Sequence, residues 1–189
     1  MGKSNVGKSL ILLSYINNGF LSMKYPQTTI SVDFKQKTEQ VNDKIINLQL
    51  WDTAGLEQFR PIIQTYYKNA KAAILVFDLN DIQSLIDVKY WLRELRIQCG
   101  KDVIKILVGN KCDLEYNEPD QEIIQQYCKE YEMEYIKTSA VMNINIQELF
   151  RNLSQKIYEK FKDGINSERK IKLNQEFQQI KNENKKKCC

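Results

Sequence analysis

The chain has 189 residues, of which 42% are hydrophobic and 28% charged, so it suits one compact domain with a short appendage, not a disordered or fibrous polypeptide. The absence of histidine excludes serine–histidine and cysteine–histidine catalysis and most zinc sites. The whole net charge of +4 arises in residues 161–189, where eight Lys and Arg face four Asp and Glu, which argues against a nucleic-acid-binding body and for a basic arm that meets an acidic surface.

The chain shows no feature of a membrane-spanning or secreted protein. It has no run of roughly 18 apolar residues and no basic segment followed by an apolar stretch at its start. Its five cysteines follow no disulfide pattern: three are scattered and two are adjacent at the end. We therefore expect a cytosolic protein.

Short apolar runs alternate with longer stretches of helical period, which predicts an α/β fold with a mostly parallel sheet. Strands are expected at Ser31–Gln40, Ile45–Asp52, Ala72–Asp78, Val103–Asn110 and Glu134–Thr138. Helices are expected at Lys8–Asn17, Arg60–Lys68, Ser84–Gln98, Asp120–Tyr131 and Ile146–Phe161. The domain would end near residue 162, and residues 163–189 would form a flexible tail, with a last amphipathic helix around Ile171, Phe177 and Ile180 as the alternative.

Residues 2–9 read Gly-Lys-Ser-Asn-Val-Gly-Lys-Ser, which satisfies the pattern of a loop that wraps phosphates at a helix N-terminus. Lys8 would reach the outer phosphates, and the Ser9 hydroxyl would bind Mg²⁺. The remaining phosphate contacts in the loop would come from Gly2, Asn5, Val6 and Gly7. Alone, this loose pattern would only suggest a nucleotide site.

Three more motifs follow at the ends of predicted strands. In Trp51-Asp52-Thr53-Ala54-Gly55, Asp52 could hold the metal through water, and the Gly55 N–H could meet a terminal phosphate. In Asn110-Lys111-Cys112-Asp113, the carboxylate could accept the two adjacent N–H donors of guanine, which adenine lacks. In Thr138-Ser139-Ala140, a backbone N–H could meet the guanine oxygen. Each motif is ordinary alone, but four in order at strand carboxyl ends predict a guanine-nucleotide site.

With these motifs the chain resembles the small GTPases of the Ras superfamily over about residues 1–162, and among them the Rab family. The Rab resemblance depends on Ile30-Ser31-Val32-Asp33-Phe34, Leu48-Gln49-Leu50-Trp51-Asp52-Thr53-Ala54-Gly55, Gln58-Phe59-Arg60, Tyr66-Tyr67-Lys68-Asn69-Ala70 and Leu75-Val76-Phe77-Asp78. It implies a P-loop G domain with a mostly parallel six-stranded sheet flanked by helices. It also implies a GTP/GDP switch with Mg²⁺ that regulates vesicle traffic on the cytoplasmic face of endomembranes, with a cytosolic pool.

The resemblance implies further sites and partners. Thr29 is similar to the switch threonine that closes over Mg²⁺ and the terminal phosphate, with Thr28 as a rival by loop length. Phe20 would stack on guanine or make a plain core contact. Cys188 and Cys189, after three lysines, resemble the double-cysteine signal for geranylgeranyl groups, and two lipid chains with basic charge anchor stably. Implied partners are effectors, exchange factors, GTPase-activating proteins, GDP-dissociation inhibitor and prenylation escort protein.

Two features of the sequence depart from the family pattern: one residue and one missing strand. Leu56 stands where the family usually places the glutamine that orients the attacking water, so intrinsic hydrolysis should be slow. The family also has a β-strand before the P-loop, which would lie between the strands expected at Ile45–Asp52 and Ala72–Asp78. Its absence here would leave two neighbouring strands unpaired.

Three functions are consistent with these features. The first is a slow GTP switch, and the second, favoured by Leu56 and the missing strand, is a scaffold that is locked with GTP or binds nucleotide weakly. The third, a P-loop kinase or metabolic ATPase, is weakened by the guanine-selecting motifs and by the lack of an arginine-rich lid.

Overall fold

A computed structural model describes residues 1–19, 33–53, 70–100 and 102–162 of the chain. In chain order, the helices are α1 (Lys8–Ile16), α3 (Ile82–Ile86), α4 (Val88–Cys99), α5 (Gln121–Tyr131) and a last helix over residues 146–162. The strands are β1 (Asp33–Val41), β2 (Lys44–Asp52), β3 (Ala72–Asp78), β4 (Ile104–Asn110) and β5 (Met133–Thr138). This order confirms the predicted α/β class.

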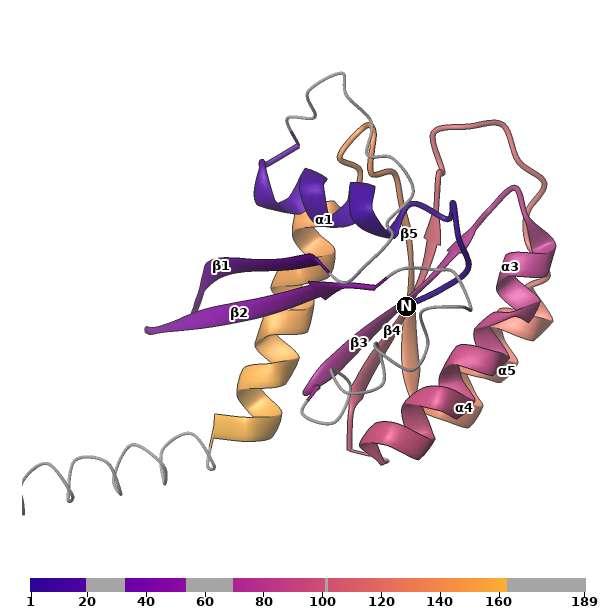
Figure 1. Ribbon diagram of the computed structural model, residues 1–189. Coiled ribbons are helices and arrows are strands. Elements are labelled where there is room, and N and C mark those ends of the chain that lie inside the picture. The colour runs from indigo at the N-terminus through magenta and orange to yellow at the C-terminus, as the bar shows by residue number, and fades with distance from the viewer. Residues whose placement is uncertain (20–32, 54–69, 101, 163–189) are drawn as a thin grey trace, which may run out of the picture.

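The strands of the described residues form two sheets (Figure 1). β1 and β2 pair antiparallel from Asp33 opposite Asp52 to Val41 opposite Lys44, around the two-residue turn Asn42-Asp43. β3, β4 and β5 pair in parallel in that spatial order. The division falls between β2 and β3, where the family resemblance placed the missing strand.

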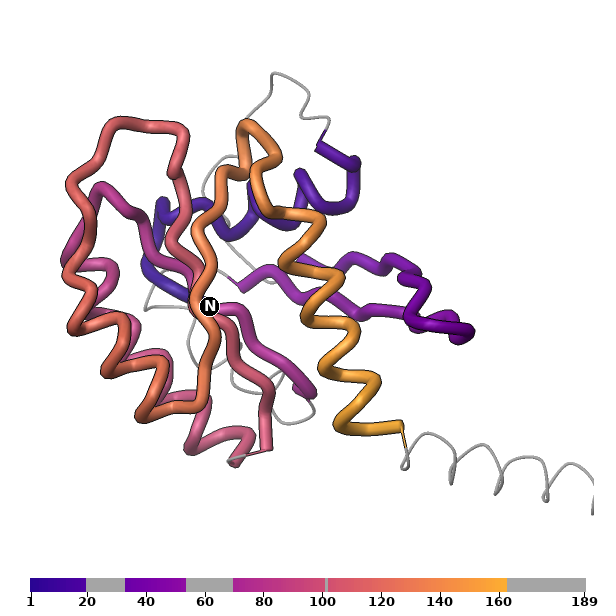
Figure 2. Tube along the Cα trace, turned by 180° about the vertical axis from the view of Figure 1, so that it is seen from behind, coloured from indigo at the N-terminus to yellow at the C-terminus, as the bar shows by residue number. Residues whose placement is uncertain are grey.

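Helices cover both faces of the parallel sheet (Figures 1 and 2). Val76 of β3 packs in one apolar cluster with α1 and the last helix, whereas its neighbours Leu75 and Phe77 pack in another cluster with α3, α4 and α5. Successive side chains of a strand point to opposite faces, so a strand buried on both faces must be apolar throughout. The run Ala-Ala-Ile-Leu-Val-Phe of β3 meets this requirement.

One predicted helix is divided in the structure. A single helix was expected over Ser84–Gln98, but α3 already begins at Ile82, where the Asp81 carboxylate accepts the N–H of Ser84 and caps the helix. The helix is then interrupted at Asp87, whose carbonyl accepts the N–H of Tyr90 at 3.0 Å, a bond of the tighter 3₁₀ spacing. The expected helix at Arg60–Lys68 and the tail after residue 162 lie outside the described residues.

The β1–β2 hairpin is tied to the rest of the fold through Tyr15 of α1. The Tyr15 hydroxyl donates to Glu39 at 2.5 Å, and the Lys37 ammonium donates to the Tyr15 carbonyl at 2.6 Å. The Tyr15 ring stacks on Phe150 of the last helix, with ring centroids 3.7 Å apart. These contacts link the hairpin, α1 and the last helix in one buried arrangement.

The open end of the hairpin, opposite its turn, carries exposed aromatic side chains. The ring centroids of Phe34 and Trp51 lie 4.5 Å apart, and Trp51 is 45% exposed, whereas Trp91 of α4 is 6% exposed.

No helix in the described ranges has the length and apolar character needed to span a membrane.

Candidate phosphate and guanine site

The residues before α1 form a tight loop at the carboxyl end of β3. Gly7 has a φ of 96°, and a Cβ atom there would collide with the side-chain nitrogen of Asn110. Gly2 has a φ of 144°, and a Cβ atom there would collide with the carbonyl oxygen of Val76. Both positions therefore require glycine. Asn5 has a φ of 65°, a conformation that asparagine tolerates better than most residues.

Lys8 lies inside the curve of this loop. Its ammonium donates to the carbonyl of Lys3 at 2.8 Å. Burial lowers the pKa of Lys8 to about 8, against the opposing effect of the nearby Asp52 carboxylate. A cation in such a dry loop, at the N-terminus of a helix, is suited to bind an anion of high charge density such as phosphate.

Ser9 and Asp52 are brought together from α1 and the end of β2. The Ser9 hydroxyl donates to the Asp52 carboxylate at 2.5 Å, and Asp52 is 8% exposed. Hydroxyl and carboxylate oxygens are the hard donors that Mg²⁺ prefers, and Mg²⁺ commonly binds to one or two such groups together with water and phosphate oxygens. The predicted Mg²⁺ residues that the structure describes thus fit this ion.

Asn110, at the end of β4, connects three segments of the site. Its amide nitrogen donates to the carbonyl of Val6, 2.9 Å away. Its amide oxygen accepts the Thr138 hydroxyl at 3.1 Å and the Ala140 N–H at 3.3 Å. Asn110 is 1% exposed, so these bonds are protected from water. The sequence predicted Asn110 as a guanine residue but missed Thr138 as a positioning residue, although Thr138 belongs to the recognised Thr-Ser-Ala motif.

The loop after Asn110 is fixed by its own contacts. Lys111 has a φ of 68° and pairs with Asp78, at the end of β3, with 2.6 Å between ammonium and carboxylate. The N–H of Cys112 donates to the Thr138 carbonyl at 3.0 Å. Asp113 follows in the same turn and is exposed, so its carboxylate is accessible to a ligand. Asp78 belongs to the stretch Leu75-Val76-Phe77-Asp78 of the family resemblance, but it was not predicted as a site residue.

The Thr-Ser-Ala segment turns back on itself just after β5. Ser139 and Ile144 exchange backbone hydrogen bonds of 3.2 and 3.0 Å, and the Ser139 hydroxyl accepts the N–H of Met142. Ser139 and Ala140 are both buried. The segment is thereby held beside Asn110, as a backbone donor to a base would need.

The structure thus brings together the predicted residues of the loop at 2–9, Asp52, and the segments around Asn110 and Ser139 at one edge of the fold. The other predicted site residues lie outside the described residues: Phe20, Thr28, Thr29, Gly55, Leu56, Cys188 and Cys189. In the described part, residues predicted to bind phosphate, metal and guanine are therefore linked by hydrogen bonds.

Comparison with known proteins agrees with this geometry. Residues 1–159 match the sequence model of the Ras family. The chain is 41% identical to GTP-binding protein YPTM1 of Zea mays, over 83% of this chain and 75% of that protein. It is 36% identical to GTP-binding protein YPT1 of Saccharomyces cerevisiae (84% of this chain, 77% of that protein) and to Ras-related protein Rab-10 of Diplobatis ommata (85% and 80%). The chain therefore belongs to the Ras family, as a small GTPase of the Rab type.

Proposed function

We propose that the protein is a GTP- and GDP-binding switch that regulates vesicle-mediated membrane traffic and hydrolyses GTP slowly on its own. The observation that carries this proposal is the set of hydrogen bonds through which Asn110 joins the phosphate loop to the segments that would select guanine. The names of the relatives, which describe GTP-binding and Rab proteins, support the same function.

Each part of the site would have a separate role. The loop N–H groups and Lys8 would hold the phosphates, with Gly2, Asn5, Val6 and Gly7 shaping the loop. Ser9, Asp52 and Thr29 would hold Mg²⁺, which neutralises phosphate charge when bound. Asn110, Lys111, Asp113, Ser139, Ala140 and Phe20 would bind the base. Thr29 and Gly55 would sense the terminal phosphate and so distinguish GTP from GDP.

The slow hydrolysis follows from Leu56. An aliphatic side chain has no donor or acceptor with which to orient the attacking water, so a large electrostatic contribution to the transition state is lost. The GTP state would then persist and would depend on a GTPase-activating protein to end it. Effectors would bind during that long period.

Membrane docking would use the chain's last two residues. Lipids on Cys188 and Cys189, together with the preceding lysines, would place the switch on the cytoplasmic face of endomembranes. The prenylation escort protein and GDP-dissociation inhibitor would then deliver and extract it, and exchange factors would load GTP.

The experiment is single-turnover GTP hydrolysis on the purified full chain, with Leu56→Gln and the control Leu56→Ala. We expect Leu56→Gln to accelerate hydrolysis at least roughly tenfold, about 1.4 kcal/mol of barrier, because it supplies the missing amide. Leu56→Ala, which removes the leucine without adding an amide, should remain slow.

The same experiment distinguishes the alternative. The alternative is a scaffold that does not cycle, which Leu56 favours because a leucine cannot orient the attacking water. Failure of all three proteins to retain guanine nucleotide would support the scaffold and contradict the switch. Retention without acceleration by Leu56→Gln would contradict the role given to Leu56.

A further inference from the structure

The turn between β3 and α3, residues 78–84, is fixed by hydrogen bonds of its own. The Ser84 hydroxyl accepts the N–H of Asp78 at 2.9 Å and donates to the Asp81 carbonyl at 2.6 Å. The Asp81 N–H donates to the Asp78 carbonyl at 2.9 Å. Ser84 is 1% exposed, so its bonds are shielded from water. A buried set of polar groups that satisfy one another is rigid, and the 78–84 turn is therefore a firm support.

Lys3 ties the phosphate loop to this support. Its ammonium lies 2.9 Å from one oxygen of the Asp81 carboxylate, and the two residues are 78 positions apart in the chain. The other oxygen of the same carboxylate accepts the Ser84 N–H at 3.3 Å and caps α3. The bond to Lys3 is the main cause that lowers the pKa of Asp81 and raises the pKa of Lys3. The ion pair thus connects the loop to the capped start of α3.

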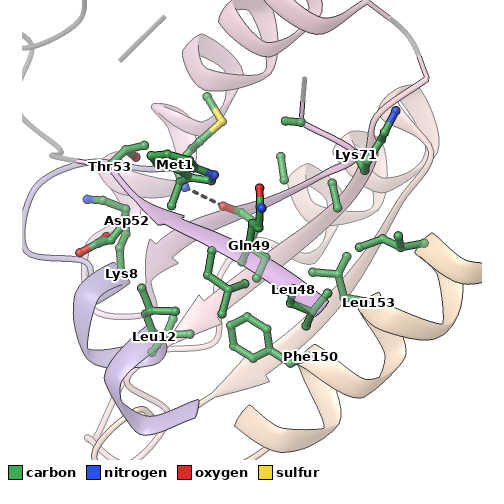
Figure 3. Close-up of a pocket in the computed structure, with 18 of the residues that line it drawn as sticks. Met1, Lys8, Leu12, Leu48, Gln49, Asp52, Thr53, Lys71, Phe150 and Leu153 are labelled. Carbon is green, nitrogen blue, oxygen red and sulfur yellow. Dashed lines mark hydrogen bonds between the residues drawn. The ribbon is translucent and has the colours of Figure 1, made fainter. Parts of the chain in front are cut away.

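The backbone of Lys3 also contacts the cation of the loop. Its carbonyl accepts the Lys8 ammonium at 2.8 Å. Figure 3 shows Lys8 beside Asp52, on the wall of a cavity that β2 and β3 line. A Lys3 side chain that is held at Asp81 therefore restrains the carbonyl to which the predicted phosphate-binding ammonium is bonded.

The other end of the 78–84 turn reaches the guanine segment, residues 110–113. One oxygen of the Asp78 carboxylate accepts the N–H of Asn80 at 2.9 Å, and the other pairs with Lys111 at 2.6 Å. A series of bonds therefore connects the phosphate loop with the guanine segment, apart from the connection that Asn110 makes. It passes through Lys3, Asp81, Ser84, Asp78 and Lys111.

We propose that Lys3 is a positioning residue of the phosphate loop: its ion pair with Asp81 braces the loop on the 78–84 turn and so holds Lys8 where phosphate binds. The proposal rests on the proposed GTP- and GDP-binding function and adds a residue to that site. The loop pattern leaves the position after its first glycine open to any residue, so the pattern alone gives Lys3 no role.

The brace acts on the loop and not on the stability of the whole fold. The side chains of Lys3 and Asp81 are 41% and 38% exposed, and ion pairs of such exposure contribute little to the free energy of unfolding. A loop that is already held in its binding geometry loses less conformational freedom when a ligand binds. We expect loss of the pair to weaken phosphate binding roughly threefold, within the range of exposed ion pairs, and to leave the urea midpoint unchanged.

The test measures the binding of magnesium pyrophosphate, and separately of GDP with Mg²⁺, to the nucleotide-free full chain by calorimetry. The variants are Lys3→Ala, Asp81→Ser and the two combined, and serine at position 81 still caps α3. Asp81→Ser is decisive, because loss of a negative charge would by itself favour an anion, whereas the brace predicts weaker binding. Each single variant should raise the pyrophosphate Kd roughly threefold, and the double variant should add nothing, because both changes remove the same bond.

Two further variants control for structural damage. Lys3→Arg can still pair with the carboxylate and should bind like the native chain. Lys156→Ala removes a similar ion pair, with Glu134 at 2.7 Å and a lysine side chain that is 37% exposed. Glu134 lies near the start of β5, at the end of the sheet opposite the candidate site, so this variant should not change binding. A carbon-13 titration of Asp81 should show a higher pKa in Lys3→Ala and the native pKa in Lys156→Ala.

Three results would overturn the proposal. Unchanged or tighter pyrophosphate binding by Asp81→Ser would show that charge, and not a brace, explains any effect of Lys3. Additive losses in the double variant would show that the two side chains act separately, and a native Asp81 pKa in Lys3→Ala would show that the pair does not form. If the native chain binds pyrophosphate but not GDP, the proposed switch is contradicted, while the pyrophosphate ratios still decide the brace. Binding of neither ligand would overturn both proposals.

Discussion

Lys8 is the side chain through which pH acts most directly on the candidate site. Its pKa of about 8 describes the protein without nucleotide, where burial disfavours the charged form. A bound phosphate would favour the charged form and raise that pKa. Nucleotide binding would then be accompanied by proton uptake at any pH between the pKa of Lys8 in the free protein and its higher pKa in the complex.

We therefore predict that GDP affinity is constant below about pH 7.5 and falls as the pH rises through 8, by up to roughly tenfold per pH unit. The measurement is a titration with GDP and Mg²⁺ between pH 7 and 9. The matched variant is Lys8→Arg, whose guanidinium stays protonated over this range, so its affinity should not follow the pH. Equal pH dependence in both proteins would show that another group is responsible.

For individual residues, the sequence predicted which side chains come together at the site, but not the ion pairs that fix their positions. Lys8, Ser9, Asp52 and Asn110 could be assigned from motif spacing, because strand carboxyl ends converge at one edge of the sheet. The ion pairs Lys111–Asp78 and Lys3–Asp81, at 2.6 and 2.9 Å, could not, because they join side chains that are distant along the chain and belong to no shared motif.

The elements of the site are held together chiefly by Asn110, which bonds the phosphate loop on one side and the end of β5 on the other. It lies at the last residue of β4 and is buried, so loss of its amide leaves several polar groups unsatisfied at once. Asn110 thus links elements as well as being a predicted guanine residue.

We predict that Asn110→Ala lowers the free energy of unfolding by roughly 3 kcal/mol even without nucleotide, from lost buried hydrogen bonds. The exposed Asn117→Ala is the control and should change stability by less than about 0.5 kcal/mol. Urea unfolding of the nucleotide-free proteins measures both. Equal midpoints for the two variants would mean that Asn110 contributes little to the architecture.

The ends of the strands were predicted well for an identifiable reason. β3 has the predicted bounds, and β2, β4 and β5 end at the predicted Asp52, Asn110 and Thr138, because a polar residue follows each apolar run. The single helix predicted over Ser84–Gln98 was wrong, because the structure divides it at Asp87. This division depends on how α3 is capped and packed against β3, which helical periodicity does not encode.

For the whole molecule, the predicted guanine-nucleotide site implies a link between ligand and stability. A ligand that binds the folded state alone stabilises it by mass action, by about 2.7 kcal/mol at a hundred times its Kd. In this chain the effect should be visible, because the phosphate loop contacts α1, β3 and β4 together.

We predict that GDP with Mg²⁺, at a hundred times its Kd, raises the Tm by roughly 5 to 10 °C, as expected for a domain of this size. ADP with Mg²⁺ at the same concentration should cause no shift, because adenine lacks the donor pair that Asp113 would accept. A thermal scan with both nucleotides measures this. Equal shifts with GDP and ADP would contradict the guanine assignment and favour a general P-loop nucleotide site.

The unequal exposure of the two tryptophans gives the protein an intrinsic optical signal. The indole of Trp51 is in contact with water and directly precedes Asp52, whereas that of Trp91 is buried under α4. A quencher dissolved in the solvent would reach the first ring and spare the second. The part of the protein's tryptophan fluorescence that responds to solvent therefore comes mainly from Trp51. This residue directly precedes Asp52, the carboxylate at the predicted metal site.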